Sequence, residues 1–255
     1  MKTRDGGMRL ELQSIAWKKA CQINGGVLLI PSGTYLVSGA TFQGPCKGQT
    51  KVSLQGTLKA TSNVTLGVDY WIGFYSVDNL IIYGNGTFDG NGASAWGRKC
   101  PTCKLPISIN FAFVRNAQVQ NIHSINSKSF HMSVFESQNM MFDSVGISAP
   151  GNSPNTDGIH IGKSNGIRIN NARISTGDDC ISMGDGSTNV NITGVSCGPG
   201  HGISIGSLGK YPQEKDVSSI RVINCTLTNT TNGVRIKTVA PSPSINVYNI
   251  DFNAL

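Results

Sequence analysis

Hydrophobic and polar positions divide the chain into a short N-terminal part with helical spacing and a long remainder with strand-like alternation. Apolar side chains at helical spacing occur at Met8, Leu12, Ile15, Ala16 and Ala20. They predict one amphipathic helix over residues 8–22, which Asn-Gly-Gly at 24–26 ends. Residues 27–31 read Val-Leu-Leu-Ile-Pro and predict a short apolar strand. No later stretch has a helical period of useful length, so we expect a helix that caps one end of an all-β body.

This body consists of a repeated sequence unit. Seven segments begin with Asn or Ser and continue with alternating apolar residues; they start at Asn79, Asn116, Asn139, Asn165, Asn189, Ser219 and Ser244. The starts are 37, 23, 26, 24, 30 and 25 residues apart, a length typical of the coils of a parallel β-helix. Leucine-rich repeats need a recurring leucine frame that is absent, and a β-sandwich lacks the longer period. We therefore expect a single β-helix domain over residues 1–255, with coils from about residue 27.

Composition and charge agree with this fold and narrow the partners. The 31 glycines and the 14% of charged residues suit many short strands joined by tight turns. The formal charge of +7 favours a polyanionic partner. No basic cluster interleaved with aromatic residues accompanies it, so we expect an acidic polysaccharide rather than nucleic acid. No apolar run reaches the roughly 18 residues of a membrane span, and we expect a monomer without membrane contacts.

Cysteines and glycosylation motifs favour the secretory pathway. The chain has seven cysteines and five Asn-x-Ser/Thr sequons, at Asn63, Asn85, Asn191, Asn224 and Asn229. Cys100 and Cys103 have CxxC spacing, but no second pair completes a zinc site, so we expect a disulfide or two separate partners and no metal. The odd count leaves one cysteine unpaired or paired outside the chain. No export segment follows Met1, and the sequence stops within a predicted coil, so we expect the native protein to extend beyond both ends.

Four short polar signatures in the second half of the chain carry the candidate chemistry. They are Asn-Thr-Asp at 155–157, Gly-Asp-Asp-Cys at 177–180, Gly-His-Gly at 200–202 and Arg-Ile-Lys at 235–237. Asp157 lies 21 residues before Asp178, and Asp179 lies 22 residues before His201. Residues one coil apart in a β-helix are about 4.8 Å from one another. These side chains should therefore stack into one site, with the Arg-Ile-Lys signature on the next coil.

Three carboxylates on adjacent coils suit the hydrolysis of a glycosidic bond. Close carboxylates cannot all ionise freely, so the pKa of one should rise. One carboxylic acid then protonates the leaving oxygen while another carboxylate activates water. Arg235 and Lys237 would hold an anionic sugar, and His201 is placed to hydrogen-bond a carboxylate. A purely structural alternative is that Asp157 and Asp178, which lie beside glycines, are Asx-turn residues.

In this order the four signatures resemble those of the polygalacturonases of glycoside hydrolase family 28. The similarity runs from about residue 14 to at least residue 238. It implies a right-handed parallel β-helix and inverting hydrolysis of α-1,4-linked galacturonan in pectin, without a cofactor. It also implies secretion to the cell wall, with pectic polysaccharide as the partner.

The same resemblance implies roles for individual residues. Asp178 resembles the general acid, and Asp157 with Asp179 resembles the pair that positions and deprotonates water. His201 resembles the residue that supports the acid. The substrate-binding residues implied are Asn155, Arg235 and Lys237, and the disulfide implied joins Cys180 to Cys197.

Three further segments, residues 90–96, 105–108 and 149–154, resemble plant pollen-type exopolygalacturonases, which implies exo action. Three alternatives remain at this point. The first is an endo-acting polygalacturonase, and the second is a truncated non-catalytic protein that only binds pectin. The third is a lyase in which adjacent aspartates bind calcium.

Overall fold

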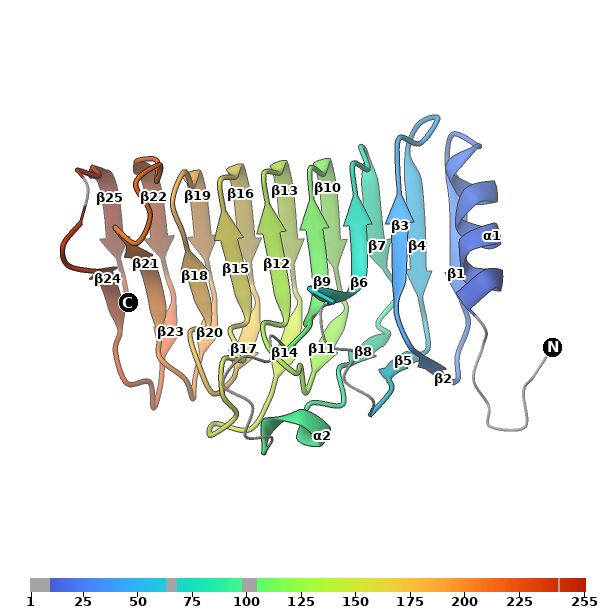
Figure 1. Cartoon of the computed structure of the whole chain (residues 1–255), viewed down its shortest axis with the longest axis horizontal. Helices are drawn as coiled ribbons and strands as arrows, with labels where there is room; N and C mark the ends of the chain where they lie inside the picture. Colours follow the sequence, from blue (N-terminus) through green and yellow to red (C-terminus); the bar gives the residue numbers. More distant parts are fainter. Residues whose placement is uncertain (1–9, 63–67, 98–104, 243) are drawn as a thin grey trace.

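The computed structural model describes residues 10–62, 68–97, 105–242 and 244–255, with side chains from residue 15 onward. The predictions for Met8, Asn63, Cys100 and Cys103 lie outside the described residues, as does the side chain of Leu12. Figure 1 shows a single row of coils, with the helix α1 (Leu10–Cys21) at one end and the last coil at the other.

Three parallel sheets run along the row of coils, and each coil contributes one strand to each sheet. The first sheet contains β1 (Gly26–Ile30), β4 (Thr50–Leu54), β7 (Leu80–Tyr83), β10 (Arg115–Gln120), β13 (Gln138–Asp143), β16 (Asn165–Asn170), β19 (Thr188–Thr193), β22 (Val217–Ile223) and β25 (Val247–Asn253). The second contains β2 (Thr34–Val37), β5 (Thr57–Ala60), β8 (Thr87–Asp89), β11 (His123–Ile125), β14 (Gly146–Ser148), β17 (Arg173–Ser175), β20 (Ser196–Cys197) and β23 (Thr226–Leu227). The third contains β3 (Ala40–Gln43), β6 (Tyr70–Tyr75), β9 (Ile107–Ala112), β12 (Met132–Phe135), β15 (Ile159–Gly162), β18 (Ile181–Met183), β21 (Ile203–Leu208) and β24 (Val234–Thr238).

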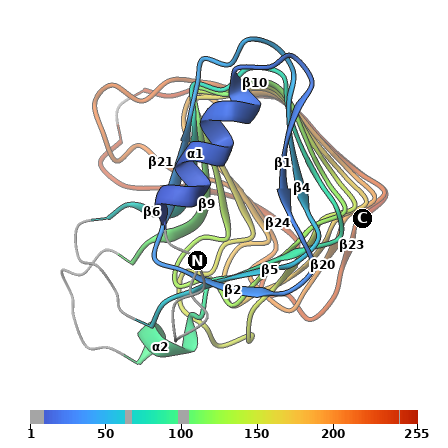
Figure 2. The same cartoon turned by 90° about the vertical axis from the view of Figure 1, so that its right-hand side faces the viewer.

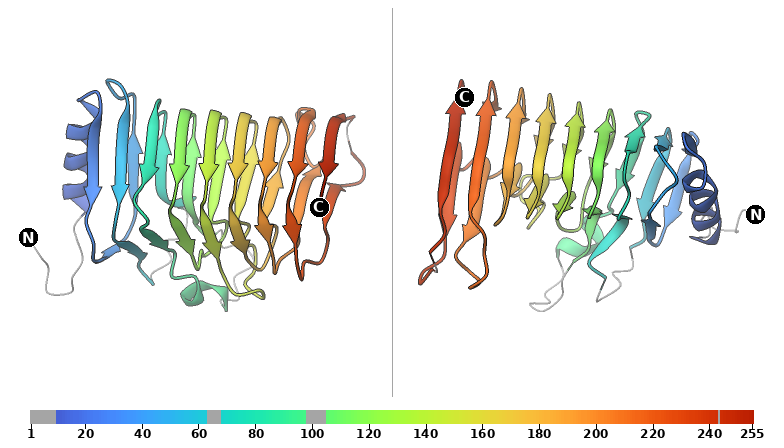
Figure 3. Two further views of the ribbon diagram at one scale, coloured as in Figure 1. Left: turned by 180° about the vertical axis from the view of Figure 1, so that it is seen from behind. Right: turned by 90° about the horizontal axis from the view of Figure 1, so that it is seen from above.

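The arrangement confirms the predicted right-handed parallel β-helix. Parallel strands joined by crossover connections adopt this hand almost without exception. The views in Figure 3 show the strands of successive coils lying side by side and parallel from α1 to the last coil. Only one other helix, α2 (Ala93–Trp96), occurs in the described part of the chain, and none there is long and apolar enough to cross a membrane.

Inward-facing side chains stack from coil to coil and fill the interior. The clearest column is aromatic: ring centroids are 4.9 Å apart between Phe42 and Phe74, 5.4 Å between Phe74 and Phe111, and 5.8 Å between Phe111 and Phe142. Each of these rings is almost fully buried. A buried aromatic side chain contributes a few kcal/mol through burial and further stabilisation through ring contacts, so this column holds four coils together.

Helix α1 covers the open end of the first coil, as Figure 2 shows, but not with the predicted face. Ile15 is 50% exposed and Ala16 is also exposed, whereas Trp17 and Ala20 are buried. The Trp17 ring lies 5.1 Å from Phe42 and thereby extends the aromatic column. The predicted face was wrong at Ile15 and Ala16, although Ala20 is buried as expected, because one large aromatic ring outweighs an aliphatic stripe when both compete for the same apolar surface.

A disulfide that the sequence did not indicate anchors the same helix. Cys21 pairs with Cys46, and the indole nitrogen of Trp17 donates a hydrogen bond of 2.9 Å to the carbonyl of Gln43. Cys225 is free and buried, and it is the one unpaired cysteine among the described residues. Strand β1, Gly26–Ile30, lies one residue earlier than predicted.

The predicted repeats all fall on the first sheet or directly before it, which explains their period. Near the start of each strand one residue adopts positive φ, and these residues are Asn79, Asn116, Asn139, Gly166, Asn189, Ser219 and Asn249. Asparagine and glycine tolerate this conformation best. Two predicted starts were therefore wrong: Asn165 precedes the true position by one residue, and Ser244 precedes Asn249 by five. The segment after Ser244 misled the prediction because it also alternates and packs Ile245 against the core.

Candidate active site

The site is built where three consecutive coils enter the third sheet. Strands β15, β18 and β21 begin with register partners that lie 22 residues apart. Asp157, Asp179 and His201 each lie two residues before one of these strands, so the stacking expected from the spacing is present. The neighbouring coils are longer: 27 residues separate Met132 of β12 from its partner in β15, and 31 separate Ile203 of β21 from its partner in β24.

Glycines in the signatures allow the coils to approach closely at this point. A Cβ atom on Gly177 would meet the backbone of Ser153, and Gly202 has a φ of 89° with the carbonyl of Asn232 beside it. Thr156 ties two signatures together, because its Oγ1 accepts a hydrogen bond of 3.0 Å from the backbone N–H of Gly177. The backbone at the site is thus fixed by sterics and by a buried hydroxyl.

A disulfide closes the coil that carries the adjacent aspartates. Cys180 and Cys197 are bonded, and both are buried. Cys180 follows Asp179 directly, so the cross-link holds the entrance of β18 against β20, which comes two strands later in the chain.

Asp179 is a buried carboxylate that accepts hydrogen bonds on both oxygens. Lys237 Nζ lies 2.6 Å from Oδ2, while Arg235 Nη2 and the Ser204 hydroxyl both lie 2.7 Å from Oδ1. Burial acts to raise the pKa of Asp179, but these hydrogen bonds outweigh burial and hold that pKa below its usual range. Asp179 is therefore an anion fixed between two cations.

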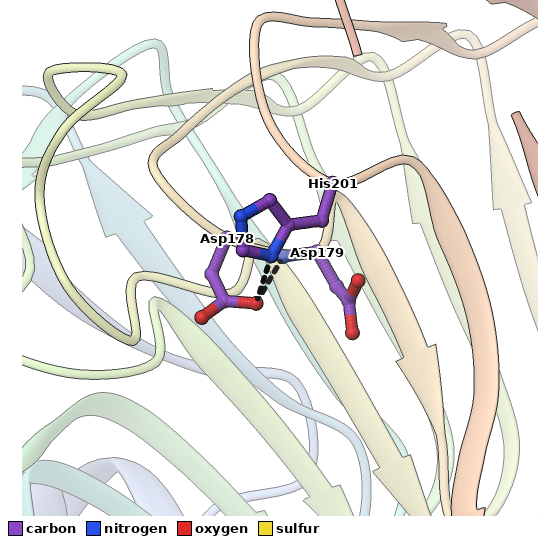
Figure 4. Close-up of side chains that lie close together, drawn as sticks. All are labelled: Asp178, Asp179 and His201. Atoms are coloured by element: carbon purple, nitrogen blue, oxygen red, sulfur yellow. Dashed lines mark hydrogen bonds and ion pairs between the residues drawn. The ribbon is translucent and has the colours of Figure 1, made fainter. Parts of the chain in front are cut away.

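Asp178 is the more accessible neighbour, with 24% of its side chain exposed against 1% for Asp179. Its Oδ1 lies 3.0 Å from His201 Nδ1 and accepts a hydrogen bond of 2.8 Å from the backbone N–H of Asp179. Figure 4 shows both contacts meeting at this one oxygen, while the two carboxylates point apart. The second oxygen of Asp178 is not used in either contact.

Asp157 is the carboxyl group with the most perturbed titration. It is 6% exposed, and Ser182 Oγ donates a hydrogen bond of 2.9 Å to its Oδ2. Burial raises the pKa of Asp157 to about 7, and the nearby charges of Asp178 and Asp179 act in the same direction. The rise expected for one member of the carboxylate group is therefore found at Asp157.

Sequence reasoning located the charged residues but missed the hydroxyls that orient them. Ser182 and Ser204 are register partners on β18 and β21, and each donates to one of the stacked aspartates. Their 22-residue spacing, equal to that of Asp157 and Asp179, was the signal that identifies them. Asn155, by contrast, is exposed in the turn before β15 and takes part in none of these hydrogen bonds among the described residues.

A calcium site does not fit this donor set. Atoms of Asp178, Asp179 and His201 lie within 4.8 Å of one another, which is a possible metal-binding arrangement. Calcium takes six to eight oxygen ligands. Here both oxygens of Asp179 are already occupied by Lys237 and Arg235, whose positive charges would repel the ion.

Comparisons with known proteins agree with the four signatures. A profile of the glycosyl hydrolases family 28 matches residues 21–255. A polygalacturonase from Gossypium barbadense is 49% identical over 232 residues, which cover 88% of this chain and 56% of that protein. An exopolygalacturonase from Zea mays is 49% identical over 238 residues, which cover 90% of this chain and 58% of that protein. The chain thus spans a little more than half the length of these relatives.

Solved structures share the fold. An endo-xylogalacturonan hydrolase from Aspergillus tubingensis superposes with a TM-score of 0.80 at 27% identity, covering 91% of this chain and 67% of that one. An exopolygalacturonase from Thermotoga maritima reaches 0.78 at 19% identity, covering 95% and 71%, and shows the fold alone. The profile match contains every coil and all four signatures, and the chain belongs to the glycosyl hydrolases family 28.

Proposed function

We propose that the protein hydrolyses α-1,4-galacturonosyl linkages of polygalacturonate and releases single sugars from a chain end. One observation carries this proposal: three stacked carboxyl groups, one of them with a raised pKa, lie beside two cations. Carboxyl groups with divergent environments supply the acid and the base of glycoside hydrolysis. Arg235 and Lys237 beside the carboxyl groups suit the binding of an acidic sugar.

The roles of the carboxyl groups follow from their surroundings. Asp178 is the general acid, because it is the accessible member and His201 supports one of its oxygens. Asp157 is the general base, since a carboxylate whose pKa lies near 7 binds a proton from water more readily than an ordinary one. Asp179 stays ionised and, with Asp157, orients the water.

The three carboxyl groups share one proton near neutral pH. With Asp179 ionised and one proton divided between Asp157 and Asp178, the negative charges equal those of Arg235 and Lys237. The productive form has the proton on Asp178 and leaves Asp157 ionised. Below its pKa of about 7 Asp157 holds the shared proton, and above that pKa it has lost it.

Inversion of the anomeric centre is expected because the carboxylate that directly follows the proposed acid in the chain is not free to attack the sugar. Asp179 lies nearest to Asp178, yet Lys237 and Arg235 hold both of its oxygens. Water activated by Asp157 is then the attacking group, and a single displacement inverts the configuration. The configuration of the sugar released first, read by proton NMR, distinguishes this path from retention.

Substrate recognition follows from the same two cations. Arg235 offers a planar fork of donors and Lys237 a flexible point charge, which together suit a uronate carboxylate. The chain-end preference is supported by the similarity to the Zea mays relative, which is named an exopolygalacturonase. The sequons and the two disulfides of the described residues support secretion to the cell wall, and we propose a monomer there.

A time course of digestion tests the proposal. Polygalacturonate is incubated with the protein and with an Asp178→Asn variant, and the products are resolved by anion-exchange chromatography. Galacturonic acid as the first product supports exo action, whereas a spread of oligomers means endo action. Binding without turnover identifies a pectin-binding protein, and unsaturated ultraviolet-absorbing products identify a lyase.

A further inference from the structure

Asp157 is linked to the outer face of the third sheet by hydrogen bonds that the proposed mechanism does not use. Ser182 Oγ donates to Asp157 Oδ2 at 2.9 Å, and His160 Nδ1 lies 2.8 Å from the same Oγ. His160 and Ser182 are register partners on β15 and β18. The three side chains therefore form a continuous chain that begins at a buried carboxyl group and ends at His160 Nε2.

The direction of the hydrogen bonds that link Asp157, Ser182 and His160 is fixed by the number of hydrogens available. A serine hydroxyl has one hydrogen, and a neutral imidazole has one N–H. When Asp157 is ionised, Ser182 donates to it, so His160 must donate from Nδ1 and its Nε2 is a bare acceptor. When Asp157 is protonated, the bonds reverse: Asp157 donates to Ser182, Ser182 donates to Nδ1, and Nε2 carries the hydrogen.

The far end of these hydrogen bonds, His160 Nε2, lies beside two glycines on the outer face of the third sheet. Residues on either side of His160 along β15 point into the core, and His160 itself is half-buried on the outer face. Gly162 and Gly184 flank the ring, and a Cβ atom on either would lie 3.8 Å from Nε2. Phe130 packs against the imidazole with ring centroids 5.1 Å apart, which fixes the ring orientation.

Burial and the charge of Lys237 keep His160 neutral. Burial lowers the pKa of His160 to about 4, and the charge of Lys237 acts in the same direction. Asp179 and Asp185 act in the opposite direction but do not outweigh these two causes. A neutral imidazole can pass a proton by exchanging which nitrogen holds the hydrogen, without storing charge.

We propose that Ser182 and His160 form a proton path between Asp157 and the outer face of the third sheet. In the outward step, Asp157 Oδ2 gives its proton to Ser182 Oγ, the hydroxyl hydrogen moves to His160 Nδ1, and the hydrogen on Nε2 passes to water. One proton leaves, Asp157 becomes a carboxylate and His160 changes tautomer. The inward step is the reverse. The inference rests on the proposed role of Asp157 as base.

This path would bring the shared proton to the right carboxyl group. In the resting protein the proton lies on Asp157, the group with the raised pKa. The outward step releases it to solvent, and the accessible Asp178 takes one up. The total charge of the site does not change, because Asp157, the proposed base, loses one proton and Asp178, the proposed acid, gains one. Ser182 and His160 are positioning residues in this scheme, since neither needs to touch the sugar.

The first test reads the tautomer directly and needs no activity. Nitrogen-15 NMR of the labelled protein follows both ring nitrogens of His160, assigned with a His160→Gln variant. We expect hydrogen on Nε2 at about pH 5 and on Nδ1 at about pH 9, with a midpoint equal to that of the Asp157 carboxyl carbon signal. In Ser182→Ala the tautomer should no longer follow Asp157. A single tautomer throughout, or unchanged coupling in Ser182→Ala, would overturn the proposal.

The second test uses kinetics with a matched control. His160→Ala should lower kcat on polygalacturonate by about tenfold or more with little change in KM, and added imidazole should restore it. Ser182→Ala should also shift the alkaline limb of the pH profile upward, because the lost donor stabilised ionised Asp157. Ser133 is the register partner of His160 one coil earlier, and the control variant Ser133→Ala should change neither kcat nor the alkaline limb of the pH profile. Unchanged kcat in His160→Ala refutes the path. A wild-type protein without hydrolysis refutes the proposed function instead, and the tautomer measurement still decides the path.

Discussion

Lys237 Nζ lies 2.6 Å from Oδ2 of Asp179, although the two residues are 58 positions apart and belong to coils on either side of β21. Each coil adds about 4.8 Å along the axis, so the lysine stem must reach back across a whole coil. The contact therefore binds three coils of a fold in which most contacts join immediate neighbours. It also makes the charge of the site depend on a strand that is late in the chain.

Replacing this lysine should damage both binding and stability. A Lys237→Met variant removes one of two cations beside buried Asp179, and we expect kcat/KM for polygalacturonate to fall about ten- to hundredfold, as for loss of a charged hydrogen bond. Thermal unfolding should show destabilisation of about 3 kcal/mol, because one partner of a buried pair remains. Lys210→Met, at an exposed lysine stacked on Tyr211, is the control and should change neither measurement. Equal kinetics in the two variants would contradict a role in recognition.

Removing the acid should abolish most turnover without unfolding the protein. We expect Asp178→Asn to lower kcat by about 10²- to 10⁴-fold, the range of general acid catalysis. Initial rates of reducing-sugar release measure the effect. Asp143→Asn, at a half-buried aspartate of the first sheet, provides the comparison and should retain wild-type rates. Full activity of Asp178→Asn would rule out the proposed acid.

Activity should fall as the pH rises through about 7. Above its raised pKa Asp157 has lost the proton that the proposed mechanism shares with the acid. Rates of hydrolysis between about pH 5 and 9, measured at constant ionic strength, check this limb. A rate that keeps rising to pH 9 would show that no proton on this group is required.

The same pKa predicts a cost in stability at high pH. The folded pKa of Asp157, about 7, lies above the ordinary value of 3.8, so between these values the folded state binds more protons than the unfolded state. Stability contributed by this group is present at low pH and is lost as the pH rises from about 4 to 7. Asp157→Asn should therefore unfold less readily than the wild type at pH 8, with a pH slope shallower by up to about 1.4 kcal/mol per unit. Denaturant titrations at several pH values, with Asp143→Asn as reference, decide the point.

His131 should make the protein sensitive to acid. It is fully buried, its Nε2 has no hydrogen-bond partner among the described residues, and burial lowers its pKa to about 3. Between about pH 6.5 and 3 the unfolded chain binds a proton that the folded chain excludes, so stability falls as the pH drops through this window. In His131→Gln the fall should be shallower by up to about 1.4 kcal/mol per unit, while the exposed His123→Gln should follow the wild type. Identical slopes would mean that His131 is not the group responsible.

The fold and the charged part of the site could be predicted because both depend on spacing along one coil. Asp157, Asp179 and His201 occur at coil intervals, and a β-helix turns such intervals into contacts. The exact register could not be predicted at Ser244, because the alternation begins in the connection three residues before β25. Alternation indicates a buried face but does not count the residues in a turn.

Polar positioning and end packing escaped prediction for a different reason. Ser182 and Ser204 are ordinary strand residues until the register places each of them against a carboxylate. Trp17 and the disulfide-bonded Cys21 are buried because the helix packs on the end of the first coil. The position of that coil end cannot be predicted from a local sequence pattern. Contacts between coils depend on the register of the strands, and that register depends on the number of residues in the turns between them.

The two steps of 22 residues that link β15, β18 and β21 have a consequence for how this scaffold diversifies. Longer steps lie on both sides, where residues 149–152 and 209–216 belong to the longer connections. Evolution or an engineer can lengthen, shorten or exchange those two flanking connections without altering the distance between the catalytic groups. Grafting them between relatives should transfer the preference for chain ends or chain interiors while the chemistry stays in place.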